Sequence, residues 1–240
     1  MPDITKIAHT NDSYLANSLS TFAGGTTWSQ LVADATAATH NNSAQNFDEG
    51  VHNGKFQGRG TSNTWECNRS LFPFDLSGES GTVASAQFKV YSDNLGDTGT
   101  NQSTVFLTNW NALDGDTGDY DLPGTLTSFG STTISTTAGY HTIDINSDGI
   151  TAINSVMASG TLTVGLLGYY DYNDTDPGTS NEVKIKIYYA NSLSAVWPKL
   201  ELTLGTSGYS HNVLGVASAD IASVNGVATA NIASVNGVDT

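Results

Sequence analysis

The chain has 240 residues and a formal net charge of −15, from 23 acidic residues against 8 lysines and arginines. So acidic a surface repels the phosphates of nucleic acids and of anionic membranes, which argues against both partners. A single cysteine excludes an intrachain disulfide framework, and 25 glycines with abundant Ser, Thr, Asn and Asp favour turns and strands over helices.

Residues 1–27 are predicted to form an N-terminal extension, with its membership of the following domain left open. Leu15, Leu19 and Phe22 have helical spacing, but the glycine pair after them would end a helix, and residues 26–28 favour the start of a strand. The first residues lack the basic start and apolar core of a signal peptide, so we expect synthesis in a cytoplasm without export by the ordinary route.

The middle of the chain alternates apolar and polar residues between turn-forming runs. Strands are predicted over residues 65–74, 84–92, 103–110, 139–145, 161–170, 182–189 and 197–204. In the second of these, every other residue from Ala84 to Val90 is apolar and should face the same side. Residues 150–157 have the spacing of one short helix. The pattern predicts an all-β fold, an antiparallel β-sandwich or jelly roll over residues 28–204.

After a linker at residues 205–211, residues 212–240 hold an 11-residue unit written about three times. The repeated positions are Val213, Gly215, Val216, Ile221, Val224, Asn225, Gly226, Val227, Ile232, Val235, Asn236, Gly237 and Val238. Asn-Gly between valines predicts a two-residue hairpin turn, because both residues tolerate positive φ. Each copy is too short to bury its own β-branched residues, so the repeats predict an assembly tail that packs on other copies or on another chain. A flexible low-complexity end is the alternative.

Three segments follow the motifs of a known family. Arg69 to Ser77 follow R-x-x-x-x-F-D-x-S, and Ser85 to Tyr91 follow S-A-x-L-x-L-Y with Phe88 at the first leucine. Residues 198–204 follow P-x-L-x-V-x-Y, with Leu204 in place of the aromatic residue. These segments resemble a jelly-roll family whose members occur in phage virion proteins and as surface or carbohydrate-binding modules of bacterial proteins.

The resemblance spans residues 30–204 and implies architecture only, since such motifs mark a fold and not an activity. The tail is separately similar to the V-N-G-V-A repeats found at the ends of phage structural proteins. Together they imply a non-enzymatic structural protein of a bacteriophage virion, such as a capsid decoration, fibre or tail component. Its partners would be other virion proteins and further copies of itself, with a trimer as one arrangement, and its location would be the virion after synthesis in the host cytoplasm. The alternatives are a carbohydrate-binding or host-receptor-binding module and a degenerate glycosidase or lyase domain.

Aromatic residues supply one candidate ligand face. Tyrosines gather near two predicted strands, at Tyr169, Tyr170, Tyr172, Tyr188 and Tyr189. Tyrosine rings can stack on sugars, although large aromatic side chains more often pack in cores. We therefore take this group as the candidate glycan or partner face, with burial in the core as the alternative.

Acidic turns supply weak candidates for metal binding. Asp114, Asp116, Asp119 and Asp121 lie within eight residues, and Ca²⁺ prefers such oxygen ligands. No spaced glutamate completes a cage, so a solvated acidic loop is the preferred interpretation.

A second acidic segment, residues 144–149, begins like a calcium loop but has Ser155 at its twelfth position. We expect Asp148 or Ser147 to cap the following helix instead. A third acidic turn, residues 171–176, has the same ambiguity. We expect no metal and no cofactor, with Ca²⁺ as the ion to test.

The sequence predicts no catalytic residues, because no nucleophile has a recognisable base and no histidine pair has ligand spacing. Glu66 and Glu182 would be the first candidates if the chain were a hydrolase. Arg69 interrupts an apolar strand, and we expect it to pair with an aspartate at a sheet end, Asp75 being the first choice. Cys67 on the same strand is expected to be a buried small apolar residue.

Overall fold

The computed structural model describes residues 2–21, 27–37, 39–41, 48–57, 63–95, 103–135, 137–157, 160–178 and 182–205, together with residues 223–224, 227–228, 234–235 and 238–239 of the tail. The strands before the tail are β1 (Ile4–Ile7), β2 (Ser13–Thr21), β3 (Thr39–Asn41), β4 (Asp48–Gln57), β5 (Asn63–Asp75), β6 (Val83–Leu95), β7 (Thr104–Asn109), β8 (Ser128–Thr133), β9 (Gly139–Asp144), β10 (Thr161–Gly168), β11 (Glu182–Ile187) and β12 (Lys199–Leu204). The helical elements are α1 (Trp28–Val32), η1 (Thr117–Tyr120), α2 (Ser147–Val156), α3 (Tyr169–Tyr172) and η2 (Ser194–Val196).

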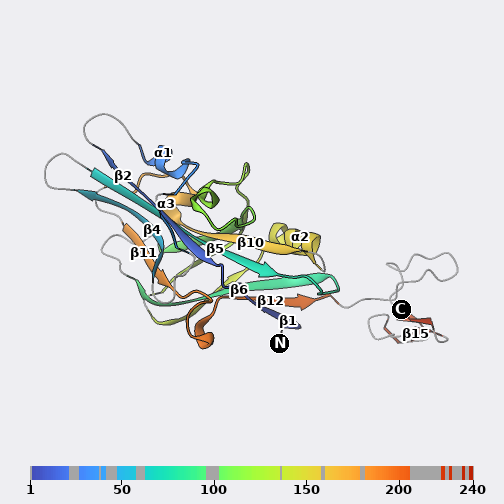
Figure 1. Cartoon of the computed structure of the whole chain (residues 1–240). Helices are drawn as coiled ribbons and strands as arrows, with labels where there is room; N and C mark the ends of the chain where they lie inside the picture. Colours follow the sequence, from blue (N-terminus) through green and yellow to red (C-terminus); the bar gives the residue numbers. More distant parts are fainter. Residues whose placement is uncertain are drawn as a thin grey trace.

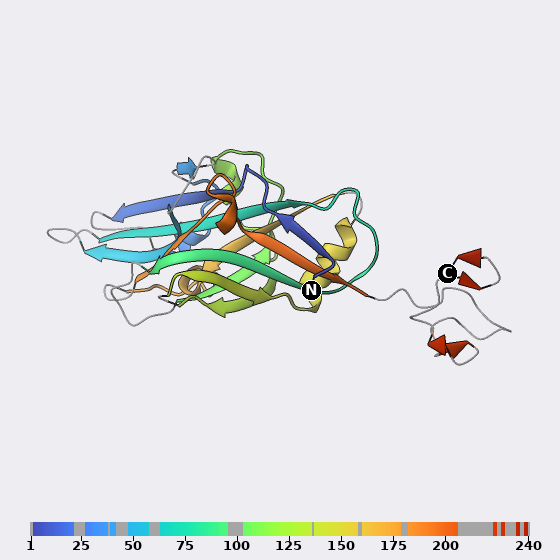
Figure 2. The same cartoon turned by 90° about the horizontal axis from the view of Figure 1, so that it is seen from below.

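The strands form two packed layers, which confirms the predicted all-β sandwich. Strands β1, β12, β6 and β9 are neighbours in the first layer, and Figure 2 looks onto this layer, with β12 in orange beside β6. Strands β2, β5, β10, β7 and β8 are neighbours in the second layer, while β4 and β11 connect β5 to β6. Every pairing between the described strands is antiparallel. The N-terminal segment contributes β1 and β2 to these layers.

Aromatic rings from both layers form the centre of the sandwich. The ring of Phe88 on β6 lies 5.3 Å from that of Phe72 and 6.1 Å from that of Phe74, both on β5. Tyr189 stacks on Phe72 with ring centroids 5.8 Å apart, and its hydroxyl lies 2.6 Å from the Ser70 hydroxyl. The alternation read from the sequence therefore directs these large side chains into one shared interior.

The apolar face predicted for residues 84–90 was wrong at its first residue. Ala84 is exposed, and Val83 is buried in its place. The pairing with β12 shifts here, because Thr203 lies opposite Ser85 whereas Leu204 lies opposite Val83. A β-bulge of this kind inserts one residue and reverses the side of those beyond it, which a regular alternation does not anticipate.

The helix boundaries also differ from the predictions. Trp28 begins α1 and no strand, because Thr27 accepts a hydrogen bond from the amide of Gln30 and the Gln30 side chain accepts one from the amide of Thr27. This capping box is a helix start signal. Leu15 and Leu19 lie in β2 and in no helix.

The predicted short helix is confirmed as α2, but its cap is Asn146, whose side chain accepts from the amides of Asp148 and Gly149. Neither Ser147 nor Asp148 is the cap. The strand predicted over residues 161–170 ends at Gly168, where the chain turns into α3.

A second core lies on the outer side of β5, where α1, η1 and α3 cover the sheet on the side away from β6 and β12 (Figure 1). Arg69 of β5 is at its centre and is fully buried. Its Nε and Nη2 each donate to one oxygen of the Asp171 carboxylate at 2.8 Å. Nη1 donates to the carbonyl of Tyr120 and Nη2 to that of Val32, both at 2.7 Å. The guanidinium carbon also lies 4.0 Å from the centroid of the Tyr120 ring.

The expected pairing of Arg69 with Asp75 at a sheet end is therefore wrong. Asp75 is exposed, and its carboxylate accepts from the amide of Ser77. The bidentate partner comes from α3, 102 residues along the chain. Cys67 is confirmed as buried, and burial raises the pKa of its thiol well above the usual value. A charged pair in this position is stable because nearly every guanidinium N–H has an acceptor.

Replacing Asp171 by Asn should destabilise the fold by about 3–5 kcal/mol, because it leaves the Arg69 guanidinium buried without a counter-charge. The measurement is urea unfolding followed by tyrosine and tryptophan fluorescence. Asp174→Asn is the matched control: Asp174 is exposed on the next turn and has φ 45, which Asn tolerates. Equal stabilities of the two variants would contradict the assigned role of Asp171.

Asp12 is a second buried ionisable side chain, and it contacts the start of the 190–198 segment. Its Oδ2 accepts from the amide of Ala190 at 2.8 Å, and Oδ1 has no hydrogen-bond partner. Burial raises the pKa of Asp12 to about 7, although the bond from Ala190 acts in the opposite direction. The folded protein thus holds a proton on this carboxyl at pH values where the unfolded chain has released it.

Because the pKa of Asp12 is raised in the folded state, the free energy of unfolding should fall as pH rises from about 4 to about 7 and level off above that. Asp12→Asn should remove this loss. The free energy of unfolding of the variant minus that of the wild type should therefore increase from about pH 4 to about pH 7. Chemical unfolding at several pH values measures it, with Asp174→Asn as control. A difference that stays constant with pH would show that folding does not raise the pKa of Asp12.

Candidate functional site

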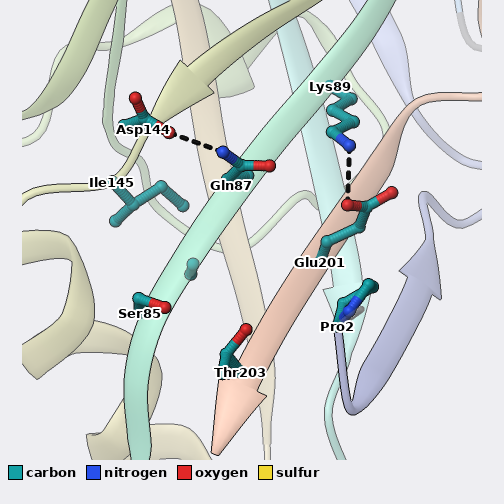
Figure 3. A pocket seen from close by; sticks show the side chains of 9 residues that line it. Pro2, Ser85, Gln87, Lys89, Asp144, Ile145, Glu201 and Thr203 are labelled. Carbon is teal, nitrogen blue, oxygen red and sulfur yellow. Dashed lines mark hydrogen bonds and ion pairs between the residues drawn. The ribbon is translucent and has the colours of Figure 1, made fainter.

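A groove of about 670 Å³ lies on the outward face of the first layer, over β6, β9 and β12 (Figure 3). Binding pockets for small molecules commonly have about 300–1,000 Å³. The groove is lined by Pro2, Ser85, Ala86, Gln87, Lys89, Asp144, Ile145, Glu201 and Thr203. Most of these are the outward residues of strands whose alternate residues form the core, so the same alternation that fills the interior also places polar groups side by side outside.

The register of three strands brings the groove's polar side chains together. Gln87 of β6 lies opposite both Asp144 of β9 and Glu201 of β12. Two residues further along β6, Lys89 lies opposite Lys199 of β12. Two carboxylates therefore flank the glutamine in a row across the sheet, on strands separated by two strand spacings, roughly 10 Å.

Two side-chain bonds hold this row in place, and both are drawn in Figure 3. The Gln87 amide nitrogen donates to Oδ1 of Asp144 at 2.7 Å. The Lys89 ammonium donates to Oε2 of Glu201, also at 2.7 Å, with 25% and 18% of the two side chains exposed. The groove thus presents hydrogen-bond donors and acceptors whose positions are set before any ligand arrives.

Beside the groove, a group of aromatic rings covers the same sheet face. Tyr91 makes edge contacts with Tyr140 and Tyr188, at centroid distances of 5.4 Å and 5.3 Å. The Lys199 ammonium lies 4.6 Å from the Tyr140 ring, and the Tyr140 hydroxyl donates to the carbonyls of residues 195 and 197. These rings fasten the 190–198 segment to the sheet and border the groove.

The five tyrosines predicted as a ligand face do not lie together. Tyr189 is inside the sandwich and Tyr170 is buried beneath α1, where its carbonyl accepts from the Trp28 indole at 3.2 Å. Tyr172 stacks on Phe106 with ring centroids 4.1 Å apart. Tyr188 belongs to the aromatic group beside the groove, whereas Tyr169 packs edge-on against Tyr170. The group is therefore split between core and surface.

The acidic loop of residues 114–121 uses its carboxylates to hold its own backbone. Asp119 is buried, and its two oxygens accept from the amides of residues 114, 115 and 116 at 2.8–3.2 Å. Asp116 accepts from the amide of Gly118 and caps η1. Asp114 and Asp121 are exposed. Within the described residues, no group of three or more His, Cys, Asp or Glu side chains could hold a metal ion.

The two other acidic segments are also divided among separate tasks. In the segment 144–149, Asp144 lines the groove, Asn146 caps α2 and Asp148 is exposed. In the segment 171–176, Asp171 is the partner of Arg69. Glu66 lies beside the buried His52, with 3.1 Å between Oε2 and Nδ1, and this contact lowers the pKa of Glu66.

In the tail, the described residues form two small antiparallel sheets. Strand β13 (Ser223–Val224) pairs with β14 (Val227–Ala228), and β15 (Ser234–Val235) pairs with β16 (Val238–Asp239). Several predicted repeat positions lie outside the described residues: Val213, Gly215, Val216, Ile221, Asn225, Gly226, Ile232, Asn236 and Gly237. The strand ends flanking both Asn-Gly pairs are described, and they are directly paired.

Sequence reasoning missed Gln87, Lys89 and Glu201 as site residues. Each looks like an ordinary solvated residue on an alternating strand, and only the pairing of strands far apart in the chain makes them neighbours. A usable signal would have been that three outward polar residues follow each other at spacing two in β6, at Ser85, Gln87 and Lys89.

No family model matches the chain, and a search of curated proteins finds no match. Within the described residues, no helix is both long and apolar enough to cross a membrane. The function must therefore be inferred from the geometry described above.

Replacing Asp119 by Ala should unfold the 114–121 loop locally and cost about 1–3 kcal/mol, because three amides lose a charged acceptor. Asp121→Ala removes an exposed carboxylate from the same loop and should cost little. Urea unfolding compares the free energies of unfolding of the two variants.

We also expect the melting temperature to differ by less than a few degrees between calcium and a chelator, since the most buried carboxylate of the loop is already bonded to its own backbone. A rise of about ten degrees with calcium would contradict this.

Proposed function

We propose that this chain is a non-enzymatic structural protein of a bacteriophage virion, a capsid decoration, fibre or tail component. The β-sandwich would be displayed outward, and the repeat tail would anchor it to a partner. The single observation that supports this most is the register of the tail: Val224 lies opposite Val227, and Val235 lies opposite Val238.

That register leaves two residues between the paired valines in each copy, the length of a tight hairpin. Each of the four tail strands is two residues long. Pairs this short are not stable alone in water, because they bury too little apolar surface to offset the ordering of the chain. Consecutive hairpins at a fixed period are therefore expected to pack on other copies of the tail or on the sheet edge of another virion protein.

The described part of the sandwich has little surface suited to permanent assembly. Among the described residues, the one large hydrophobic side chain with high exposure is Leu193, at 73%. Obligate interfaces need an extended apolar area, and a lone leucine is ordinary on a soluble domain. Attachment through the tail would leave the outward face of the sandwich accessible. Several copies of the tail, for example three, can also pack against one another around a rotation axis to form the anchor.

Deleting residues 209–240 should leave the sandwich folded but unable to incorporate into particles. The test is to assemble particles with the truncated and full-length proteins and to measure copy number by quantitative mass spectrometry. Normal incorporation of the truncated protein would overturn the anchor proposal.

Gly226→Val with Gly237→Val should reduce incorporation nearly as much as deletion, because β-branched residues resist the positive φ of such turns. Gly124→Val is the matched control, since a side chain added at Gly124 meets nothing within 4 Å. Incorporation equal to that of the control would show that the hairpin turns are not needed.

The proposal includes the absence of catalysis. Asp144 and Glu201 are the two acidic side chains that line the groove, and each is bonded to a neighbouring side chain. A polysaccharide-degradation screen of the full chain should release no product. Product release that is lost in Glu201→Gln would overturn the non-enzymatic assignment.

The alternative function, a carbohydrate- or receptor-binding module, is favoured by the groove itself and is compatible with display on a virion.

A further inference from the structure

The groove over β6, β9 and β12 retains hydrogen-bonding capacity after its internal bonds are made. A carboxylate can accept about four hydrogen bonds and an ammonium can donate three. Asp144 and Glu201 each use one oxygen in the bonds described, and Lys89 and Gln87 each use one donor. The lining therefore still offers acceptors on both carboxylates and donors on Lys89, all directed over the same sheet face (Figure 3).

The charges of the lining select against ions. A phosphate, sulfate or carboxylate ligand would meet the two carboxylates, Asp144 and Glu201, on a protein with a net charge of −15. A metal ion would meet the Lys89 ammonium, which already occupies one oxygen of Glu201. A ligand that both donates and accepts hydrogen bonds without net charge fits this mixture of groups best.

We propose that the groove is a binding site for a neutral saccharide. Sugar hydroxyls donate and accept at once, so they match alternating carboxylate, amide and ammonium groups. Pro2 is exposed and supplies apolar surface for the C–H face of a sugar ring, while Ile145, mostly buried, lines the opposite side (Figure 3). The two internal side-chain bonds hold the polar groups in place beforehand, which lowers the entropy lost on binding.

The groove does not depend on the tail, because its lining consists of Pro2 and residues of the sandwich. A virion protein that displays this face outward would present the groove to glycans of a host surface. Failure of the tail experiments would leave the glycan proposal standing, and the reverse is also true.

The test uses the full chain on an array of neutral, sialylated and sulfated oligosaccharides, followed by calorimetric titration of whichever glycan is captured. We expect capture of neutral glycans. Glu201→Gln and Asp144→Asn should each weaken binding by about 10-fold to 100-fold, the effect of losing a charged hydrogen-bond acceptor. Asp148→Asn makes the same change of charge on an exposed residue outside the groove and should bind like wild type.

A second variant guards against loss of folding. Ser85 is exposed and lines the groove, so Ser85→Trp should block the site while leaving the core untouched. Melting temperatures within a few degrees of wild type would show that the variants are folded. Capture of no glycan, capture of acidic glycans alone, or equal affinity in folded Ser85→Trp, Glu201→Gln and wild type would each overturn the proposal.

Discussion

The bond between the Arg69 guanidinium and the Asp171 carboxylate holds together the outer side of the second layer. A buried charge is unfavourable unless its polar atoms find partners, so the chain must supply acceptors around it. It does so from three separate places: α1 supplies the carbonyl of Val32, η1 supplies the carbonyl of Tyr120, and α3 supplies the carboxylate. Helical segments of four or five residues are not stable alone. Here one guanidinium bonds to all three and determines where they lie on the sheet.

This arrangement gives the two outward faces of the sandwich different characters. The outer face of β5 is covered by short helical elements and becomes a second core. On the outer face of β6, the short η2 segment is fastened through Tyr140 beside Tyr91, and the polar side chains of Ser85, Gln87 and Lys89 line the groove. A strand with apolar residues on one side can use the other side for recognition at little cost to folding, because the two sets of side chains do not touch. The binding face proposed here is therefore separate from the groups that stabilise the fold.

In the function proposed here, the sandwich carries recognition and the tail carries assembly, for a related reason. The sandwich buries its large apolar residues within its own two cores, with Leu193 as the exposed exception among the described residues. The described tail strands are two residues long and too short to bury theirs, which is why the proposed function has the tail pack on a partner. A domain that is complete by itself can carry a ligand site that varies freely, while the repeat retains the constraint of fitting its neighbours.

Local patterns in the sequence determined the class of the fold, most of the strands, the helix α2 and the pairing of valines in the tail. These follow from alternation, helical spacing and turn chemistry, all of which act between residues close in the chain. The tertiary structure decided the partner of Arg69, which lies 102 residues away although Asp75 is nearer in sequence. It also decided the groove, where Gln87 meets Asp144 from 57 residues away and Lys89 meets Glu201 from 112 residues away. Strand register makes such contacts, and register depends on how whole layers pack and where a bulge falls, so no short stretch of sequence contains it.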